Sequence, residues 1–137
     1  PFVLCYCDNF TGYDLKKLIE THVHGHKTVT LALFHAADPT RHGIMQVTDG
    51  LVTSLVERPR RPKSDLAFAG MGCFEPDIYQ AARNVHMSPK GEYYLTDAIM
   101  DLIRQGKPVG YAEVDTYRVN INTPDDIEAA EKYLRRN

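Results

Sequence analysis

The pattern of apolar and polar positions divides this chain into segments with the lengths and periods of β-strands and α-helices. Residues 2–7 form an unbroken apolar run with β-branched and aromatic members, which is typical of a strand buried on both faces. Between residues 12 and 24, apolar side chains recur at helical spacing, and Gly25 predicts the end of that helix. Residues 28–36 are again rich in β-branched and aliphatic side chains. These blocks predict a strand, helix and strand whose two strands run parallel.

The rest of the pattern predicts a hairpin, further strands and three more helices. Asp49-Gly50 is a hairpin turn signal between two short apolar runs. In order, we expect strands at 44–47, 51–57 and 66–74, a helix at 76–84, irregular chain at 85–94, a helix at 96–105, a strand region at 109–120, and a last helix opened by Thr123 and Pro124. The fold class is therefore α/β, with a mixed, mostly parallel sheet flanked by helices in a single domain over residues 1–137.

Composition narrows the classes of partner and compartment. A chain of 137 residues with a net charge of −2 and a pI near 6.3 offers no basic surface for nucleic acid or an anionic membrane. The sequence contains no long apolar span or secretory signal, and its three cysteines lack metal-ligand spacing, so we expect reduced core thiols in a cytoplasmic protein. His22, His24 and His26 alternate, but a helix end separates them, which argues against a metal trio. A chain that starts at Pro1 suggests a fragment or a processed protein.

Asp8 is the first candidate site residue, because it directly follows the apolar run of residues 2–7. In open α/β sheets, ligands bind beyond the carboxyl ends of the strands. Position alone is equally compatible with a different role, in which Asp8 caps the next helix.

Six short segments, in their order and spacing, carry a resemblance to a known family. They are CDN (7–9), DPTRHG (38–43), LVERP (55–59), FAGMGCF (68–74), EYYLTDAI (92–99) and YRVNINTPDDI (117–127). Together they resemble the sugar-phosphate nucleotidylyltransferases, which make NDP-sugars from a nucleoside triphosphate and a sugar 1-phosphate. The resemblance covers the later part of the transferase domain and lacks the family's N-terminal glycine-rich nucleotide-binding loop. It implies a partial Rossmann-like nucleotidyltransferase fold.

The resemblance implies a Mg²⁺ site at Asp8 and Asn120, because these positions match the two metal-binding positions of the family. Mg²⁺ binds a few hard oxygen ligands from the protein together with phosphates and waters. One carboxylate and one amide oxygen are therefore a reasonable set of protein ligands. The ion would neutralise the attacking sugar phosphate and the α-phosphate. Without the resemblance, Asn120 is equally well interpreted as a turn residue before the last helix.

The resemblance also implies a sugar-phosphate site. Glu57 matches a sugar-hydroxyl acceptor, Arg58 stands where a lysine commonly touches the sugar phosphate, Gly43 and Gly70 match close-approach glycines, and Glu92 matches a residue facing a sugar hydroxyl. From the residues alone, Glu57 and Arg58 are a solvated charge pair at a strand end. Three positions depart from the family: Arg58 itself, Phe68 in place of a frequent asparagine, and Cys7 in place of the usual glycine.

Three functions compete. The first is Mg²⁺-dependent nucleotidyl transfer to a sugar 1-phosphate by direct in-line attack, without a protein nucleophile. The second, suggested by the missing glycine-rich loop, is a non-catalytic module that binds sugar phosphates or NDP-sugars. The third is a haloacid-dehalogenase-like phosphatase with Asp8 as nucleophile, which ranks last because Phe10 occupies the place of its second acid. An apolar strand at residues 2–7 also needs partner strands, so we expect an upstream segment, a second subunit in a homo-oligomer, or a swapped element beside it.

Overall fold

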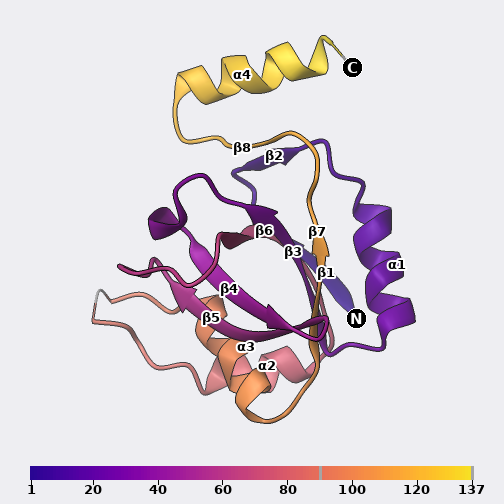
Figure 1. The fold of residues 1–137 in the computed structure, drawn as a ribbon, viewed down its shortest axis with the longest axis vertical. Helices are drawn as coiled ribbons and strands as arrows, with labels where there is room; N and C mark the ends of the chain where they lie inside the picture. The colour runs from indigo at the N-terminus through magenta and orange to yellow at the C-terminus, as the bar shows by residue number, and fades with distance from the viewer. Residues whose placement is uncertain (90, 137) are drawn as a thin grey trace.

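Strands and helices alternate through the computed structural model, which describes residues 1–89 and 91–136 (Figure 1). The strands are β1 (Phe2–Cys5), β2 (Asn9–Thr11), β3 (Val29–His35), β4 (Gly43–Thr48), β5 (Leu51–Glu57), β6 (Leu66–Phe74), β7 (Val109–Glu113) and β8 (Arg118–Asn120). The helices are α1 (Leu15–Gly25), α2 (Asp77–Arg83), α3 (Leu95–Arg104) and α4 (Pro124–Leu134), with a short 3₁₀ turn at Pro39–Arg41. Most of the predicted elements are present, and their ends shift by a few residues.

The main sheet is built around β6, in which all nine residues are buried. One edge of β6 pairs with β3, and β7 lies beyond β3. The other edge is shared, because β1 pairs with residues 71–74 and β4 meets β6 at Ala67, with β5 outermost. A mixed sheet with helices on its faces confirms the α/β class.

The direction of the strands differs from the prediction of a mostly parallel sheet. Among the described residues, the parallel ladder is β3 with β7, and the remaining ladders are antiparallel. β1 and β3 do point the same way, as the predicted strand, helix and strand require, but both pair antiparallel with β6, which lies between them. The reason is topological, since a strand far along the chain inserts between two strands that a helix connects.

Helices cover the two faces of the sheet and define two cores. Val29, Leu31 and Leu33 of β3 belong to the larger core, together with Ile99 and Leu102 of α3. The alternate residues of β3 face α1, where Leu18, Ala32 and Met71 lie in a second cluster. Figure 1 shows α1 on one side of the sheet and α2 with α3 on the other. Within the described part of the chain, no helix combines the length and apolar character needed to cross a membrane.

A second, two-stranded sheet carries the last helix away from the main sheet. The predicted strand region 109–120 divides into β7 and β8, and β8 pairs antiparallel with β2, a strand that the sequence pattern did not predict. Tyr133 of α4 stacks on Tyr117 at 4.5 Å between ring centroids, and Phe10 of β2 packs edge-on against both rings. Figure 1 shows α4 lying above this β2–β8 ribbon. These aromatic rings fasten α4 to the ribbon.

Two predictions about the first residues are wrong. β1 ends at Cys5, and its side chains alternate between half-buried and exposed, with Val3 39% exposed. Phe2 and Leu4 pack against the larger core, whereas Val3 and Cys5 on the opposite face are exposed. Cys5 and Cys7 are exposed, which contradicts the prediction of core thiols for them. All three cysteines are free, and Cys73 is buried as predicted. The expectation of a further partner beside β1 stays a prediction.

The ends of α1 also differ from the sequence prediction. Asp14, and not Asp8, is the N-cap residue, because its side chain accepts a hydrogen bond from Lys16 N. At the other end the left-handed position falls on His26, with a φ of 49°, one residue after Gly25. Asp8 is therefore free of the capping role that its position also allowed.

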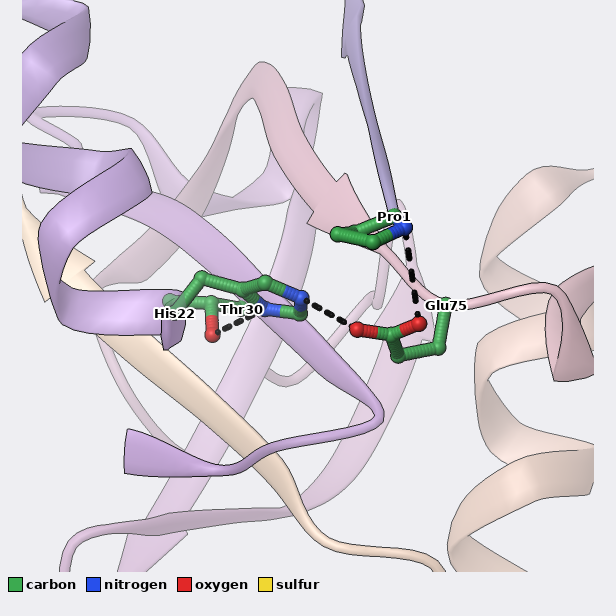
Figure 2. Close-up of polar contacts among 4 residues, drawn as sticks. All are labelled: Pro1, His22, Thr30 and Glu75. Atoms are coloured by element: carbon green, nitrogen blue, oxygen red, sulfur yellow. Dashed lines mark hydrogen bonds and ion pairs between the residues drawn. The ribbon is translucent and has the colours of Figure 1, made fainter. Parts of the chain in front are cut away.

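A buried histidine joins α1 to the sheet (Figure 2). The His22 side chain is 3% exposed, its Nδ1 lies 2.9 Å from Thr30 Oγ1 of β3, and its Nε2 lies 3.3 Å from Glu75 Oε1. Both ring nitrogens are thus partnered, as a buried imidazole requires. This pairing gives His22 a structural role in holding α1 against the sheet.

We predict that His22→Ala lowers the free energy of unfolding by about 1–3 kcal/mol, because the Thr30 hydroxyl is left buried without its partner. His24→Ala is the matched control, since His24 is exposed on the same helix, and it should change stability by less than about 0.5 kcal/mol. Urea unfolding of both variants measures the difference. Equal losses for the two would mean that the His22 contacts contribute nothing specific.

Candidate functional site

A pocket of about 280 Å³ opens where β1 and β4 part along their shared edge of β6. It is lined by Tyr6, Asp8, Asn9, Arg41, His42, Gly43, Glu57, Arg58, Phe68, Gly70, Tyr94, Leu95, Thr96, Arg118 and Asn120. The predicted site residues in this lining are Asp8, Gly43, Glu57, Arg58, Gly70 and Asn120. Residues from five separate stretches of sequence therefore meet at one pocket, and their individual roles remain predictions.

Glu92 is the predicted site residue that does not line the pocket. Its Oε2 accepts a hydrogen bond from the Tyr94 hydroxyl at 2.5 Å, and Tyr94 does line the pocket. This hydrogen bond, more than any other effect, raises the pKa of Tyr94. Glu92 thus hydrogen-bonds a residue of the pocket lining without being part of that lining itself.

A bulge in β6 shapes the floor of the pocket. The β3–β6 register passes from Leu31 opposite Gly72 to Leu33 opposite Phe68, so β6 contains extra residues around Gly70. Gly70 has a φ of +72°, and a Cβ on it would lie 2.7 Å from Asn9 Nδ2. Glycine is required here on both counts, the left-handed backbone and the close approach of Asn9.

Phe68, which replaces the family's frequent asparagine, forms an aromatic wall of the pocket. Its ring lies edge-on to Tyr6 with 5.7 Å between centroids. Burial raises the pKa of the Tyr6 hydroxyl, and the nearby charges of Glu57 and Asp8 raise it further. Tyr6 therefore stays a neutral hydroxyl at physiological pH. Cys7, the other departure nearby, is exposed and is not among the lining residues.

Gly43, Glu57 and Thr96 form the side of the pocket on which the family resemblance predicts a sugar. A Cβ on Gly43 would lie 2.8 Å from Glu57 Oε2 and 3.6 Å from Thr96 Cγ2, so glycine lets the carboxylate lie against the chain. Arg58 Nε lies 3.6 Å from Glu57 Oε1, and Arg58 itself has a φ of 43°. The Thr96 hydroxyl is buried and has no hydrogen-bond partner among the described residues. A carboxylate and an unpartnered hydroxyl are suited to hydrogen-bonding a polyhydroxyl ligand.

Asp8 and Asn120 are brought together by the β2–β8 ribbon. Asn9 stands opposite Asn120 in the ladder, and the backbone N–H of Ile121 donates to the Asp8 carbonyl at 2.7 Å. The Asp8 carboxylate accepts a hydrogen bond from Asn9 Nδ2 at 2.9 Å. The ribbon therefore places the two residues predicted to hold a metal at the same end of the pocket.

Arg118 lies between Asn9 and Asn120, and the sequence prediction gave it no role. Its Nη2 donates to Asn9 Oδ1 at 2.6 Å and to Asn120 Oδ1 at 2.5 Å, while its guanidinium lies 4.1 Å from the centre of the Phe34 ring. Burial lowers the pKa of Arg118, and the charge of Asp8 opposes that shift. The guanidinium keeps its charge, because arginine is not deprotonated in proteins.

The side chains at this end do not fit a Mg²⁺ ion held jointly by Asp8 and Asn120. The Asn120 amide oxygen already accepts a hydrogen bond from a cation, and that cation would repel the ion. Within residues 1–89 and 91–136, no group of three or more histidine, cysteine, aspartate or glutamate side chains is arranged to hold a metal. The Mg²⁺ site stays a prediction that this arrangement does not favour.

Positive charge exceeds negative charge around the pocket. Arg41, Arg58 and Arg118 line it against the carboxylates of Asp8 and Glu57. Burial lowers the pKa of His42, and the charges of Arg118 and Arg41 lower it further, so His42 is neutral near pH 7. A pocket with excess guanidinium charge, hydroxyls and a carboxylate suits an anionic ligand that also carries hydroxyl groups.

Several lining residues inside the quoted segments escaped the sequence prediction, among them His42 in DPTRHG, Thr96 in EYYLTDAI and Arg118 in YRVNINTPDDI. Thr96 had no signal beyond its position in its segment. Arg118 did have one, because it is two residues from Asn120 and therefore shares its face of a strand.

The chain is similar to curated sugar-phosphate nucleotidyltransferases. It is 36% identical over 118 residues to glucose-1-phosphate thymidylyltransferase from Streptomyces antibioticus, covering 85% of this chain and 33% of that protein. It is 34% identical over 99 residues to the UTP–glucose-1-phosphate uridylyltransferase AglF from Haloferax volcanii, covering 72% of this chain and 41% of that protein. The chain thus spans well under half of each relative.

Solved structures agree on the fold. A UDP-glucose pyrophosphorylase complexed with UDP-glucose superposes with a TM-score of 0.85 at 18% identity, covering 99% of this chain and 57% of the other. The sequence profile of the family described as nucleotidyl transferase matches residues 1–136. This match gives no support to the dehalogenase-like alternative, and Phe10 indeed packs against Tyr117 and Tyr133. The chain belongs to the nucleotidyl transferase family.

Proposed function

We propose that this chain forms the sugar-phosphate side of a nucleotidyltransferase that joins a nucleoside monophosphate group from a nucleoside triphosphate to a sugar 1-phosphate, with release of pyrophosphate. The observation that carries the proposal is the pocket, in which Asp8, Gly43, Glu57, Arg58, Gly70 and Asn120 converge. The curated relatives named as glucose-1-phosphate thymidylyltransferase and uridylyltransferase support the same reaction class.

In this proposal the pocket residues bind and orient the substrate. Glu57 accepts hydrogen bonds from sugar hydroxyls, with Gly43 leaving room for the sugar against the backbone, and Arg58 binds the phosphate. Thr96 supplies a further hydroxyl, which is buried and otherwise unpartnered among the described residues. The attacking group is the sugar phosphate itself, so the reaction proceeds through positioning and charge neutralisation and needs no protein nucleophile.

A non-catalytic sugar-phosphate or NDP-sugar binding role is the second candidate, because the pocket contains binding groups and the chain spans a third to two fifths of its curated relatives. Two measurements separate the candidates. Binding of UDP-glucose, dTDP-glucose and glucose 1-phosphate is measured by thermal shift, where a ligand at 100 times its Kd adds about 2.7 kcal/mol of apparent stability. Pyrophosphate release from each nucleoside triphosphate plus glucose 1-phosphate is then measured on the same protein. Binding with release supports the transferase, binding without release supports the second candidate, and no binding contradicts both.

We predict that Glu57→Ala weakens binding of glucose 1-phosphate by about tenfold or more, because a hydrogen bond to a charged group is worth roughly 1.5–3 kcal/mol. Isothermal titration calorimetry measures the change. Glu128→Ala, an exposed glutamate on α4 away from the pocket, is the control and should bind as the unmodified protein does. Unchanged affinity in the Glu57 variant would remove Glu57 from the site.

We predict that Gly70→Ala reduces both stability and ligand binding, whereas Gly50→Ala reduces stability alone. The two glycines have nearly the same φ, +72° and +75°, so each substitution costs about 1–2 kcal/mol of backbone strain. A Cβ at Gly50 meets nothing within 4 Å, but one at Gly70 displaces Asn9 at the pocket. Thermal unfolding and calorimetry on both variants measure the difference. Equal binding by the two would show that Asn9 tolerates displacement.

A further inference from the structure

Arg118 lies beside Asn120, at the end of the pocket where the family resemblance predicts a divalent cation. A single nitrogen, Nη2, donates to both Asn9 Oδ1 and Asn120 Oδ1. These two asparagines stand opposite each other in the β2–β8 ladder, so the guanidinium ties the ribbon together where it faces the pocket. Its location is thus held by the fold, and a bound ion is not needed to draw the two asparagines together.

The environment of Arg118 leaves its charge incompletely neutralised. No ion pair joins Arg118 to a carboxylate among the described residues, and its hydrogen-bond acceptors are neutral amides. Its Nε is buried without a partner in the same part of the chain. The guanidinium also lies over the face of Phe34, which holds the group in place without supplying a negative charge. A partly buried cation with neutral partners favours an anionic ligand beside it.

Both Nη2 hydrogens of Arg118 are donated to asparagines and Nε is buried, so Nη1 is the nitrogen left to donate to a phosphate oxygen, and the guanidinium adds its positive charge. Arg41 and Arg58 also line the pocket. With Arg118 they make three guanidinium groups against the two carboxylates of Asp8 and Glu57. Arg58 is paired with Glu57 at 3.6 Å. Arg118 is the most buried of the three lining arginines, and within the described residues it has no ion pair with a carboxylate.

We propose that Arg118 binds the phosphate group of the ligand directly, so that phosphate binding in this pocket does not depend on a divalent cation. This proposal rests on the proposed function and names how the same site recognises the anionic part of its substrate. It also accounts for the poor fit of Mg²⁺, because Arg118 supplies positive charge at the place where the family resemblance predicts the ion.

The test is a calorimetric titration of the protein with glucose 1-phosphate and, separately, inorganic phosphate, each in EDTA and in millimolar Mg²⁺. For the unmodified protein, the Kd of glucose 1-phosphate should agree within about threefold between EDTA and Mg²⁺. In EDTA, Arg118→Met should weaken binding of both probes at least tenfold. The Kd of Arg118→Lys should lie between those of the unmodified protein and Arg118→Met, because lysine keeps the charge and loses the paired hydrogen bonds to Asn9 and Asn120. Arg83→Met, an exposed arginine on α2, is the matched control and should bind normally.

A second expected result distinguishes a specific loss of binding in Arg118→Met from unfolding of that variant. Removing the guanidinium frees Asn120 Oδ1, so Arg118→Met should regain part of its affinity when Mg²⁺ is added, a gain that an unfolded protein cannot show. Thermal unfolding confirms that each variant is folded.

The outcomes separate this inference from the proposed function. The role of Arg118 is overturned if the unmodified protein needs Mg²⁺ to bind glucose 1-phosphate. It is also overturned if, in EDTA, the Arg118→Met variant has the same affinity as the unmodified protein. Either result leaves the proposed function standing. Arg118-dependent binding in which inorganic phosphate matches glucose 1-phosphate supports the role of Arg118 and overturns the sugar specificity. Absence of binding by either probe in either buffer overturns both.

Discussion

The structure depends on the burial of β6, a strand that is covered on both faces and paired on both edges. A buried backbone must satisfy every N–H and C=O, so β6 can exist only with neighbours along its whole length. β3 supplies one edge, but β1 and β4 divide the other between them. Two strands that share an edge must separate somewhere, and they do so beside the bulge at Gly70. The pocket is the space that this separation leaves.

The pocket therefore gathers its residues from the ends of strands. Tyr6 and Asp8 follow β1, Gly43 begins β4 and Glu57 ends β5. Polar and charged side chains can collect there because strand ends carry backbone groups and side chains out of the apolar core. The β2–β8 ribbon closes one end and brings its asparagines and Arg118 to the pocket. The result is a polar site with excess positive charge attached to an apolar sheet.

The sequence predicted local features of this site more readily than contacts between residues that are far apart along the chain. The Asp49-Gly50 turn joins β4 to β5 as predicted, because both residues take positive φ and a tight turn is a local property. The convergence of Asp8, Gly43, Glu57, Arg58, Gly70 and Asn120 followed from the family resemblance, which carries long-range information that composition lacks. Glu92 lies outside the pocket lining and accepts a hydrogen bond from Tyr94, which is part of it. The capping alternative for Asp8 was decided by Asp14, six residues further along.

The sequence by itself determined most of the local structure: the helices, the longer strands, the hairpin turn, and which residues are apolar enough to make a core, but not the short strand β2. These properties depend on neighbours within a few residues, so they can be predicted from spacing and composition. Tertiary structure alone decided that β6 runs between β1 and β3, that Val3 and Cys5 of β1 are exposed, and that Arg118 stands between Asn9 and Asn120. Each depends on segments that are distant in sequence and adjacent in space, and contacts of that kind are set by the packing of the whole chain.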